Sequence, residues 1–276
     1  MVFAAESCRE ERDGRGKENE KQEAGSRIRL SLRLKAVAAF VPEGFRAADI
    51  GTDHGYIPIY LVETGRVPGV LAMDVGKGPL ERAKAHTEAM NPELRDRIEL
   101  RLSDGLKGMK TGEAQTVIIA GMGGELMIRI LDEGRHVWES VDTWVLSPQS
   151  ELEEVRRFLL REGFAVLREQ MVKDNGKFYT VMAASRGKME CEQKEELRYG
   201  PCLIRDKNPV LLEYLAQEEK RILGIREGFD LEKAEQWTPG QRTAFRQLGE
   251  ELELIGKTRR RMGHKEEYIS EVQRDN

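Results

Sequence analysis

Apolar residues in this chain occur in two patterns, as short continuous runs and as stretches with a spacing of three or four. The helical spacing of positions 30, 34, 37 and 41 predicts a first helix between Arg27 and the Pro-Glu-Gly at 42–44. Beyond it the two patterns alternate. They predict strands at 46–51, 69–76, 97–105, 116–124 and 143–150, and helices at 54–65, 78–90, 125–135 and 151–163. We expect Pro58 to interrupt the helix at 54–65 early.

Two extended runs complete this region, at 164–176 and 177–185, and the sequence Asp174-Asn175-Gly176 between them predicts a hairpin. Strands separated by helices of about 10–15 residues form a parallel sheet with helices on both faces. A terminal hairpin adds an antiparallel strand at the edge of that sheet, which is typical of Rossmann-like methyltransferases rather than of most dehydrogenases. We therefore predict an α/β domain of this type over residues 26–187.

The two ends of the chain differ from this domain. Residues 188–276 are highly charged, and apolar positions 211, 215, 222 and 225 predict one helix while 245, 248, 252 and 255 predict another. Residues 228–241 would join them in a small antiparallel hairpin that resembles a coiled coil. Residues 1–25 are polar and have almost no large apolar side chains, so we expect a disordered tail.

Composition and charge indicate where in the cell the protein works and whether it holds a structural metal. Net charge is −4, no run approaches the roughly 20 apolar residues of a membrane span, and the first residues lack the apolar core of a secretory signal. The three cysteines, Cys8, Cys191 and Cys202, include no CxxC pair, which argues for a reducing compartment and against a disulfide frame or a structural zinc. We expect a cytoplasmic protein with no membrane contact, no metal and no obligate protein partner.

Candidate chemistry gathers just after the strands, where an open parallel sheet binds its ligands. The candidates are Asp49, Gly51, Asp53, His54 and Gly55 after the first strand, Asp74 after the second, and Asp104 and Gly105 after the third. The first loop is not GxGxxG, and it offers acids where a pyrophosphate would need bare amides. A cofactor with a cationic centre, an amino group and ribose hydroxyls suits acids at consecutive strand ends. The pattern therefore predicts S-adenosylmethionine.

Two of the acids have an expected partner on the cofactor. Asp74 is placed to accept hydrogen bonds from two ribose hydroxyls, and Asp104 can accept one from an adenine amino group. His54 could touch the methionine carboxylate or a substrate base, or it could cap the next helix. For any single aspartate the alternative is a role in capping its own loop, but the recurrence at three strand ends favours a shared ligand.

Several motifs together resemble one enzyme family. They are "ADIGTDHGYIP", "GKGPLERAK", "SDGL", "IIAGMGGEL", "LSPQ" and "KDNGKFYTV". The chain is similar to the bacterial tRNA adenine N1-methyltransferases that modify adenine 22 in the D-loop region. The resemblance is dense over about residues 29–187 and looser to about 260, and the family often carries "LQPN" where this chain has "LSPQ". It implies a class I enzyme that methylates N1 of that adenine and has tRNA as its partner.

The glycine loop after the fourth strand is the most specific of these motifs. Amino methyltransferases that act on exocyclic nitrogens carry a [DNS]-P-P-[YFW] element there, and this sequence has none. Adenine N1 has an in-plane lone pair and no proton, so no general base is expected and positioning should dominate. We predict that Gly121, Met122 and Gly123 position the base and that Ala120 contacts the cofactor. Close packing of the next helix is the alternative, and it could account for Gly124.

Basic residues near both ends are the candidate RNA contacts. They are Arg27, Arg29, Arg33 and Lys35 on the first helix, and Arg259, Arg260 and Arg261 with Lys257 and Lys265 beyond the helical hairpin. Tyr179, on the strand after the hairpin turn, is a candidate for stacking on a base. A solvated helix face is the alternative for the basic residues, and the hairpin could instead form a dimer.

Other functions stay open at this point. The same cofactor could serve a small-molecule or protein methyltransferase. A non-enzymatic RNA-binding or scaffold protein could retain a vestigial cofactor site, although intact acids at the strand ends argue against decay. An NAD-dependent oxidoreductase is disfavoured by the acidic first loop and by the terminal hairpin. The sequence does not identify the tRNA species or the oligomeric state.

Overall fold

The computed structural model describes residues 26–189, 191 and 193–264. The predicted tail at 1–25, together with Cys8 and Lys265, lies outside the described residues. The chain forms two compact units. The first extends to Met122 and resumes over Leu126–Ser147, and the second contains Gly123–Glu125 and the chain from Pro148 onward. The predicted domain boundary after residue 187 falls within the second unit and stays a prediction.

One sheet contains all the strands of the described residues. The strands are β1 (Ala47–Ile50), β2 (Val70–Asp74), β3 (Ile98–Leu102), β4 (Thr116–Ala120), β5 (Thr143–Ser147), β6 (Phe164–Asp174) and β7 (Lys177–Arg186). Their order is β3-β2-β1-β4-β5-β7-β6. Strands β1 to β5 pair in parallel, and β6 pairs with β7 antiparallel. The predicted parallel sheet with a terminal hairpin is confirmed.

Burial follows from position in the sheet. All residues of β1 and β2 are buried, whereas β3, at the edge of the sheet, is partly exposed. Central strands of a parallel sheet are covered on both faces, so they read as continuous apolar runs. Strand order reverses between β1 and β4. The loops that follow these two strands therefore begin at the point where such sheets bind ligands.

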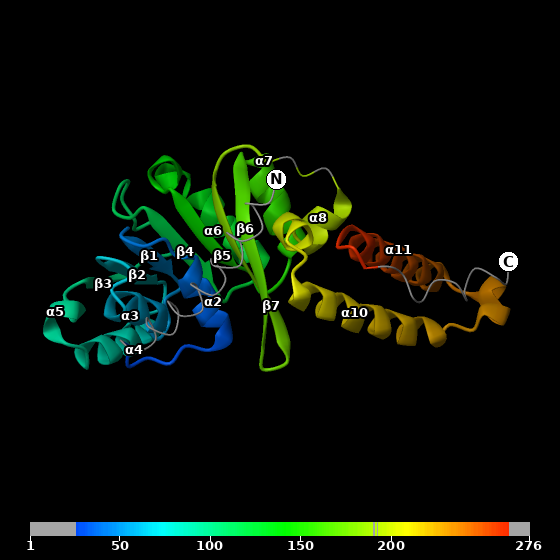
Figure 1. Cartoon of the computed structure of the whole chain (residues 1–276), viewed down its shortest axis with the longest axis horizontal. Helices are drawn as coiled ribbons and strands as arrows, with labels where there is room; N and C mark the ends of the chain where they lie inside the picture. Colours follow the sequence, from blue (N-terminus) through cyan, green and yellow to red (C-terminus); the bar gives the residue numbers. More distant parts are fainter. Residues whose placement is uncertain (1–25, 190, 192, 265–276) are drawn as a thin grey trace, which may run out of the picture. The chain divides into compact units, whose positions relative to one another are not determined.

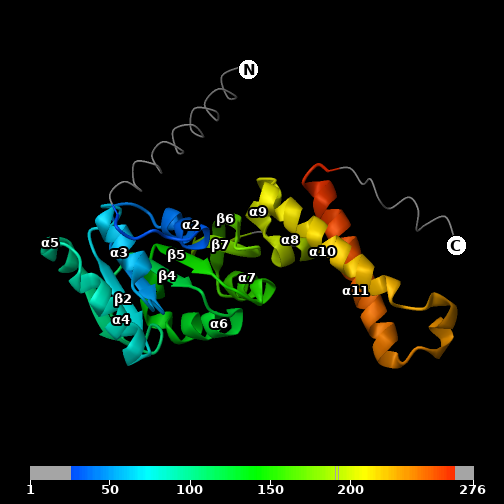
Figure 2. The same cartoon turned by 90° about the horizontal axis from the view of Figure 1, so that it is seen from below.

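The helices of the first unit are α2 (Leu32–Phe40), α3 (Tyr56–Glu63), α4 (Lys77–Glu88), α5 (Pro92–Arg95), α6 (Gly124–Glu133) and the 3-10 helix η1 (Arg135–Ser140). Of these, α6 begins with residues that belong to the second unit. Helix α2 lies on one side of β4 and β5 and α6 lies on the other (Figure 2). Helices on both faces are what the sequence pattern predicts.

The second unit carries the remaining helices. They are α7 (Leu152–Arg161), α8 (Lys194–Tyr199), α9 (Pro201–Arg205), α10 (Pro209–Glu227), the 3-10 helix η2 (Leu231–Gln236) and α11 (Pro239–Arg261). Helices α10 and α11 lie side by side as two long rods (Figure 1). Their contact buries Leu211, Leu215, Ile222, Leu254 and Ile255. The predicted helical hairpin is present, and no helix in the described part of the chain is long and apolar enough to cross a membrane.

Two predictions about helix ends were wrong in detail. The first helix begins at Leu32, because the Ser31 side chain accepts a hydrogen bond from Leu34 N and caps it there. Pro58 does not interrupt α3. That helix starts at Tyr56, so Pro58 lies in its first turn, where backbone N–H groups have no partner within the helix. The missing N–H of proline therefore costs nothing at this position.

A buried ion pair joins four elements of the second unit. Arg156 on α7 contacts Glu169 on β6 at 2.9 Å, and neither side chain is exposed at all. The other oxygen of Glu169 accepts a hydrogen bond from Cys202 N at the start of α9. Arg156 also donates to the carbonyl of Leu197 on α8. This contact ties the short helices that precede the helical hairpin to α7 and β6.

Candidate active site

Two buried acids stand at neighbouring strand ends in the first unit. Asp49 is the next-to-last residue of β1 and is 4% exposed, and Asp74 is the last residue of β2 and is 9% exposed. Burial raises the pKa of Asp49 to about 7; a hydrogen bond from Thr52 opposes this, and the negative charge of Asp74 adds to it. Neither acid forms an ion pair with the described residues. The pair is therefore a buried acidic site that favours a cationic partner.

Asp74 also shapes the loops around it. Its Oδ1 accepts a hydrogen bond from Gly76 N at 2.8 Å, and its Oδ2 accepts one from Asp53 N at 3.3 Å. Its backbone carbonyl accepts one from Ser103 N at 2.9 Å, just after β3. A carboxylate can accept about four hydrogen bonds, so the Asp74 carboxylate retains acceptor capacity for a ligand.

Side chains of α4 contact the rest of the loop after β1. Arg82 donates to Asp53 Oδ1 at 2.7 Å, and a Cβ on Gly55 would lie 3.1 Å from the side chain of Ala83. His54 belongs to a cluster of rings, with centroids 5.2 Å from Tyr56 and 5.7 Å from His86. The residue that precedes α3 is Gly55, so His54 does not provide its cap. Cofactor contacts of Asp53, His54 and Gly55 stay predictions.

Asp104 differs from the other two acids. It is exposed, and Lys107 Nζ contacts its Oδ2 at 2.6 Å, which lowers the pKa of Asp104. A Cβ on the next residue, Gly105, would lie 3.1 Å from Ile130 on α6. Packing against α6 is therefore sufficient to explain this glycine. The predicted cofactor roles of Asp104 and Gly105 stay predictions.

The cofactor loop and the glycine loop meet within the first unit. A Cβ on Gly51 would lie only 2.8 Å from Met122 Cε, so the Met122 side chain lies directly against Gly51. Gly51 and Gly121 both have positive φ, +76° and +85°, a conformation that favours glycine. Ala120, at the end of β4, is partly exposed. The loop after β1 and the loop after β4 are therefore in contact through Gly51 and Met122, while the cofactor and base contacts of these residues stay predictions.

The second half of the glycine loop contacts the segment before α7. A Cβ on Gly124 would lie 2.6 Å from Ser150 O, and one on Gly123 would lie 3.0 Å from Ser150 Oγ. Gly124 N also donates to Glu151 Oε2 at 3.0 Å. Close packing therefore explains Gly124, although its neighbour is the segment before α7 and not the sheet, and it does not explain the positive φ of Gly121.

The predicted RNA contacts are distributed over both units, and Arg27 and Arg29 precede α2 instead of lying on the first helix as predicted. Arg27 pairs with Glu63 at 3.2 Å, while Arg29 is exposed. Arg33 and Lys35 lie partly buried on α2, and Tyr179 lies partly buried on β7. Their roles in RNA binding stay predictions.

Near the end of α11 the predicted cationic residues are engaged with acids of the same unit. Arg259 pairs with Glu219, and Arg261 contacts Glu195 at 2.9 Å. Lys257 contacts the same Glu195 at 3.1 Å. Within the predicted arginine cluster, Arg260 and Arg261 are exposed and Arg259 is partly buried. Much of the positive charge in this cluster is therefore balanced by the protein itself.

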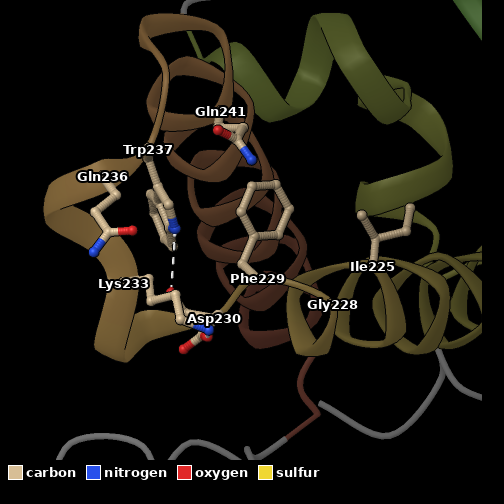
Figure 3. Close-up of a pocket in the computed structure, with 8 residues that line it drawn as sticks. All are labelled: Ile225, Gly228, Phe229, Asp230, Lys233, Gln236, Trp237 and Gln241. Carbon is tan, nitrogen blue, oxygen red and sulfur yellow. Dashed lines mark hydrogen bonds and ion pairs between the residues drawn. The ribbon is translucent and has the colours of Figure 1, made fainter.

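A pocket of about 440 Å³ lies elsewhere, at the tip of the helical hairpin (Figure 3). It is lined by Ile225, Gly228, Phe229, Asp230, Lys233, Gln236, Trp237 and Gln241. Trp237 donates to Asp230 O at 3.1 Å, and Lys233 pairs with the Asp230 carboxylate at 2.8 Å. The ring of Phe229 lies 5.3 Å from those of Trp237 and Phe245. Satisfied polar groups and mutually packed rings indicate a cluster that closes the hairpin, and it includes no predicted site residue.

Sequence reasoning missed several residues that shape the loops. Gly76 N donates a hydrogen bond to the Asp74 carboxylate, and Ser103 Oγ accepts one from Gly108 N at 2.9 Å. The Arg82 guanidinium donates a hydrogen bond to the Asp53 carboxylate. Glu151 bonds the glycine loop. Only Gly76 and Ser103 gave a local signal, since each stands beside a predicted acid. Arg82 and Glu151 act across sequence separations that no local pattern reveals.

A sheet of this order, with a terminal hairpin and acids at consecutive strand ends, defines a Rossmann-like methyltransferase that uses S-adenosylmethionine. Residues 30–182 match the family described as a methyltransferase domain. The tRNA (adenine(22)-N(1))-methyltransferase of Bacillus subtilis is 32% identical to this chain over 233 residues, which cover 83% of this chain and 96% of that protein. The chain belongs to the tRNA (adenine(22)-N(1))-methyltransferase family.

Solved structures agree with this assignment. A Streptococcus pneumoniae protein in complex with S-adenosyl-L-methionine is 30% identical, with a TM-score of 0.73 over 83% of this chain and 99% of that chain. The m1A22 tRNA methyltransferase of Bacillus subtilis is 31% identical, with a TM-score of 0.72 over 84% of this chain and 99% of that chain. Both comparisons extend well beyond the methyltransferase domain match, into the helical region.

Proposed function

We propose that this protein transfers the methyl group of S-adenosylmethionine to N1 of adenine 22 in bacterial tRNA. The observation that carries the proposal is the meeting of Gly51 and Met122, because it brings the predicted cofactor loop against the predicted base-positioning loop. Relatives that cover most of the chain carry this activity in their names. A tRNA substrate would place the protein's work in the cytoplasm.

The acids at the strand ends fit the cofactor. Asp49 and Asp74 form no ion pair with the described residues, and the raised pKa of Asp49 reflects burial without a cation. A ligand with an ammonium group and a sulfonium would stabilise the ionised form of Asp49. Asp74 has acceptor capacity left for ribose hydroxyls. Residues Asp49, Gly51 and Asp74 would hold the cofactor, which supplies an electrophilic methyl group when bound.

The main contribution of the protein to the reaction would be to position the adenine base relative to the methyl group of the cofactor. The N1 lone pair of adenine is free to attack, so no residue has to remove a proton first. The task of the chain is to hold the base in line with the methyl group and to exclude obstructing side chains. The loop from Gly121 to Gly123 suits this task because Gly121 and Gly123 carry no side chain that could obstruct a flat ring. Adenine N1 is on the pairing edge, so the base must be unpaired or flipped.

The test is methyl transfer to unmodified tRNA. Two transcripts of one tRNA would be compared, one with adenine at position 22 and one with guanine there. We expect incorporation of one methyl group into the first transcript only, with 1-methyladenosine in its nuclease digest and a reverse-transcription stop at position 22. Equal methylation of both transcripts would contradict the position. Absence of methylation in an enzyme that binds S-adenosylmethionine would contradict the substrate class.

A further inference from the structure

The glycine loop after β4 is fixed by the chain segment that follows β5. Gly121 N donates to Ser147 O at 3.2 Å. Gly124 N donates to Glu151 Oε2 at 3.0 Å, and Ser150 Oγ donates to the same carboxylate oxygen. The loop is therefore held at its start by a backbone carbonyl and at its end by a side chain.

The Glu151 residue, whose carboxylate bonds Gly124 N, has an unusual backbone conformation. Its φ of 49° and ψ of 38° lie in the left-handed region, which residues other than glycine rarely adopt. It precedes α7, a position where a serine, threonine or aspartate would normally cap the helix. Its side chain makes no capping hydrogen bond to α7. The carboxylate instead bonds Gly124, the first residue of α6.

The glycine at position 124 is what makes this contact possible. A Cβ there would lie 2.6 Å from Ser150 O and 2.9 Å from Glu151 Cβ. The two backbones are therefore too close for a side chain at position 124, and the Glu151 carboxylate joins them with a hydrogen bond from Gly124 N.

We propose that Glu151 is a positioning residue for methyl transfer, acting through the glycine loop; the inference rests on the proposed function. The carboxylate fixes Gly124 N and so fixes the end of the stretch that begins with Gly121 and Met122. Displacement of a reacting group by about 1 Å can lower a rate by about 100-fold. Loss of the Glu151 carboxylate should therefore lower kcat more than it changes cofactor binding.

A purely structural role makes a different prediction. If Glu151 only caps α6, its loss lowers thermal stability and leaves kcat unchanged. Glu151→Gly separates the two roles, because it removes the carboxylate and at the same time relieves the left-handed backbone. Glu151→Ala removes the carboxylate alone, and Glu151→Gln keeps an oxygen that can accept from Gly124 N. Lys207→Gly is the matched control, since Lys207 has a similar φ of 51° away from the loop.

Five quantities would be measured on the full chain: kcat and KM with tRNA, the Kd of S-adenosylmethionine, Tm, and hydrogen exchange of the peptide 118–130. For Glu151→Ala and Glu151→Gly we expect kcat to fall roughly 10- to 100-fold and exchange to rise, with the cofactor Kd within about threefold of wild type. Glu151→Gly should keep or raise Tm. Glu151→Gln should restore most of kcat, and Lys207→Gly should leave kcat unchanged.

Two outcomes would overturn the inference. The first is a kcat for Glu151→Gly equal to that of an active wild-type enzyme. The second is hydrogen exchange of the loop peptide that is unchanged in both Glu151→Ala and Glu151→Gly. If the wild-type protein itself fails to methylate tRNA, the proposed function fails. The exchange experiment then still decides whether Glu151 holds the loop.

Discussion

The two units differ in whether a described cationic side chain pairs with a buried carboxylate. In the first unit, Asp49 forms no ion pair with the described residues, and burial raises its pKa to about 7. In the second unit, Glu195 has a side chain with 0% exposure, yet contacts with Lys257 and Arg261 offset its burial. Burial alone would raise the pKa of Glu195, but its own backbone N–H, Lys257 and Arg261 lower it overall.

The difference separates binding sites from structural contacts. Removing an acid from water is costly unless a cation or several donors replace the water. Where the protein provides the cation, as for Glu195 and for Glu169 with Arg156, the contact holds helices and strands together. Where none of the described residues pairs with a buried acid, as at Asp49, a ligand can provide the cation. A buried acid without a cation therefore marks the candidate cofactor site.

The largest effect is expected from breaking a buried pair. Arg156→Ala should lower the free energy of unfolding by about 3–5 kcal/mol, because it leaves Glu169 buried without its cation. Arg157→Ala is the control on the same helix, since Arg157 is 49% exposed and pairs with Glu153 at the surface; it should cost about 0–1 kcal/mol. Urea unfolding measures both. Equal effects of the two variants would remove the distinction between buried and exposed pairs.

A side chain in the glycine loop should affect turnover most. Gly121→Val places a branched side chain at a φ of +85° where the base is expected to approach. We expect kcat to fall by about 100-fold while the Kd of S-adenosylmethionine changes much less. Gly112→Val is the control, because Gly112 has a φ of +81° and a Cβ there meets nothing within 4 Å. Normal turnover of a folded Gly121→Val protein would contradict the positioning role.

Removing the second strand-end acid should weaken cofactor binding. A hydrogen bond from a ligand to a charged group contributes roughly 1.5–3 kcal/mol, so Asp74→Ala should raise the Kd of S-adenosylmethionine by about 10- to 150-fold. Asp74→Asn keeps one acceptor oxygen for the loop amides and should lie between wild type and Asp74→Ala. Calorimetric titration gives these values. An unchanged Kd in folded Asp74→Ala protein would show that this acid serves the loops alone.

Cofactor affinity should depend on pH through Asp49. The folded protein holds a proton on this carboxyl up to a pKa of about 7, above the usual 3.8. Its contribution to stability therefore falls as pH rises from about 4 to about 7. A cationic ligand needs the ionised form, so affinity should rise about tenfold between pH 6 and pH 8. Asp49→Asn should remove this dependence, and a pH-independent Kd in the wild type would contradict it.

The smallest effect is expected at the exposed end of α11. Arg260→Glu should weaken tRNA binding a few-fold and reduce the salt slope by about one or two, if this residue contacts a phosphate. Arg246→Glu, exposed on the same helix, is the control. Reversal of Arg261 would be a poor test, because Arg261 pairs with the buried Glu195. An unaltered slope in Arg260→Glu would favour the alternative of a solvated helix face.

Much of the architecture could be read from local pattern. The buried runs at 47–50 and 70–74 are strands because both faces of a central strand are covered, and the turn at Asn175-Gly176 has the left-handed φ values that these residues favour. Short elements such as α5 and α9 were not predicted, because a helix of four or five residues has too few positions to show a period. The start of α2 depends on a single cap at Ser31 and was placed too early.

The sequence by itself determined the fold class, the position of Asp49, Asp74 and the glycine loop at strand ends, and the resemblance to a methyltransferase family. These properties depend on residues close together in the chain. Only the tertiary structure decided that none of the described residues forms an ion pair with the buried Asp49, that Met122 lies against Gly51, and that the Glu151 carboxylate accepts a hydrogen bond from Gly124 N. Whether a charge is paired and whether two backbones touch depends on segments that are distant in sequence. Folding brings those segments together, and no local pattern encodes their contacts.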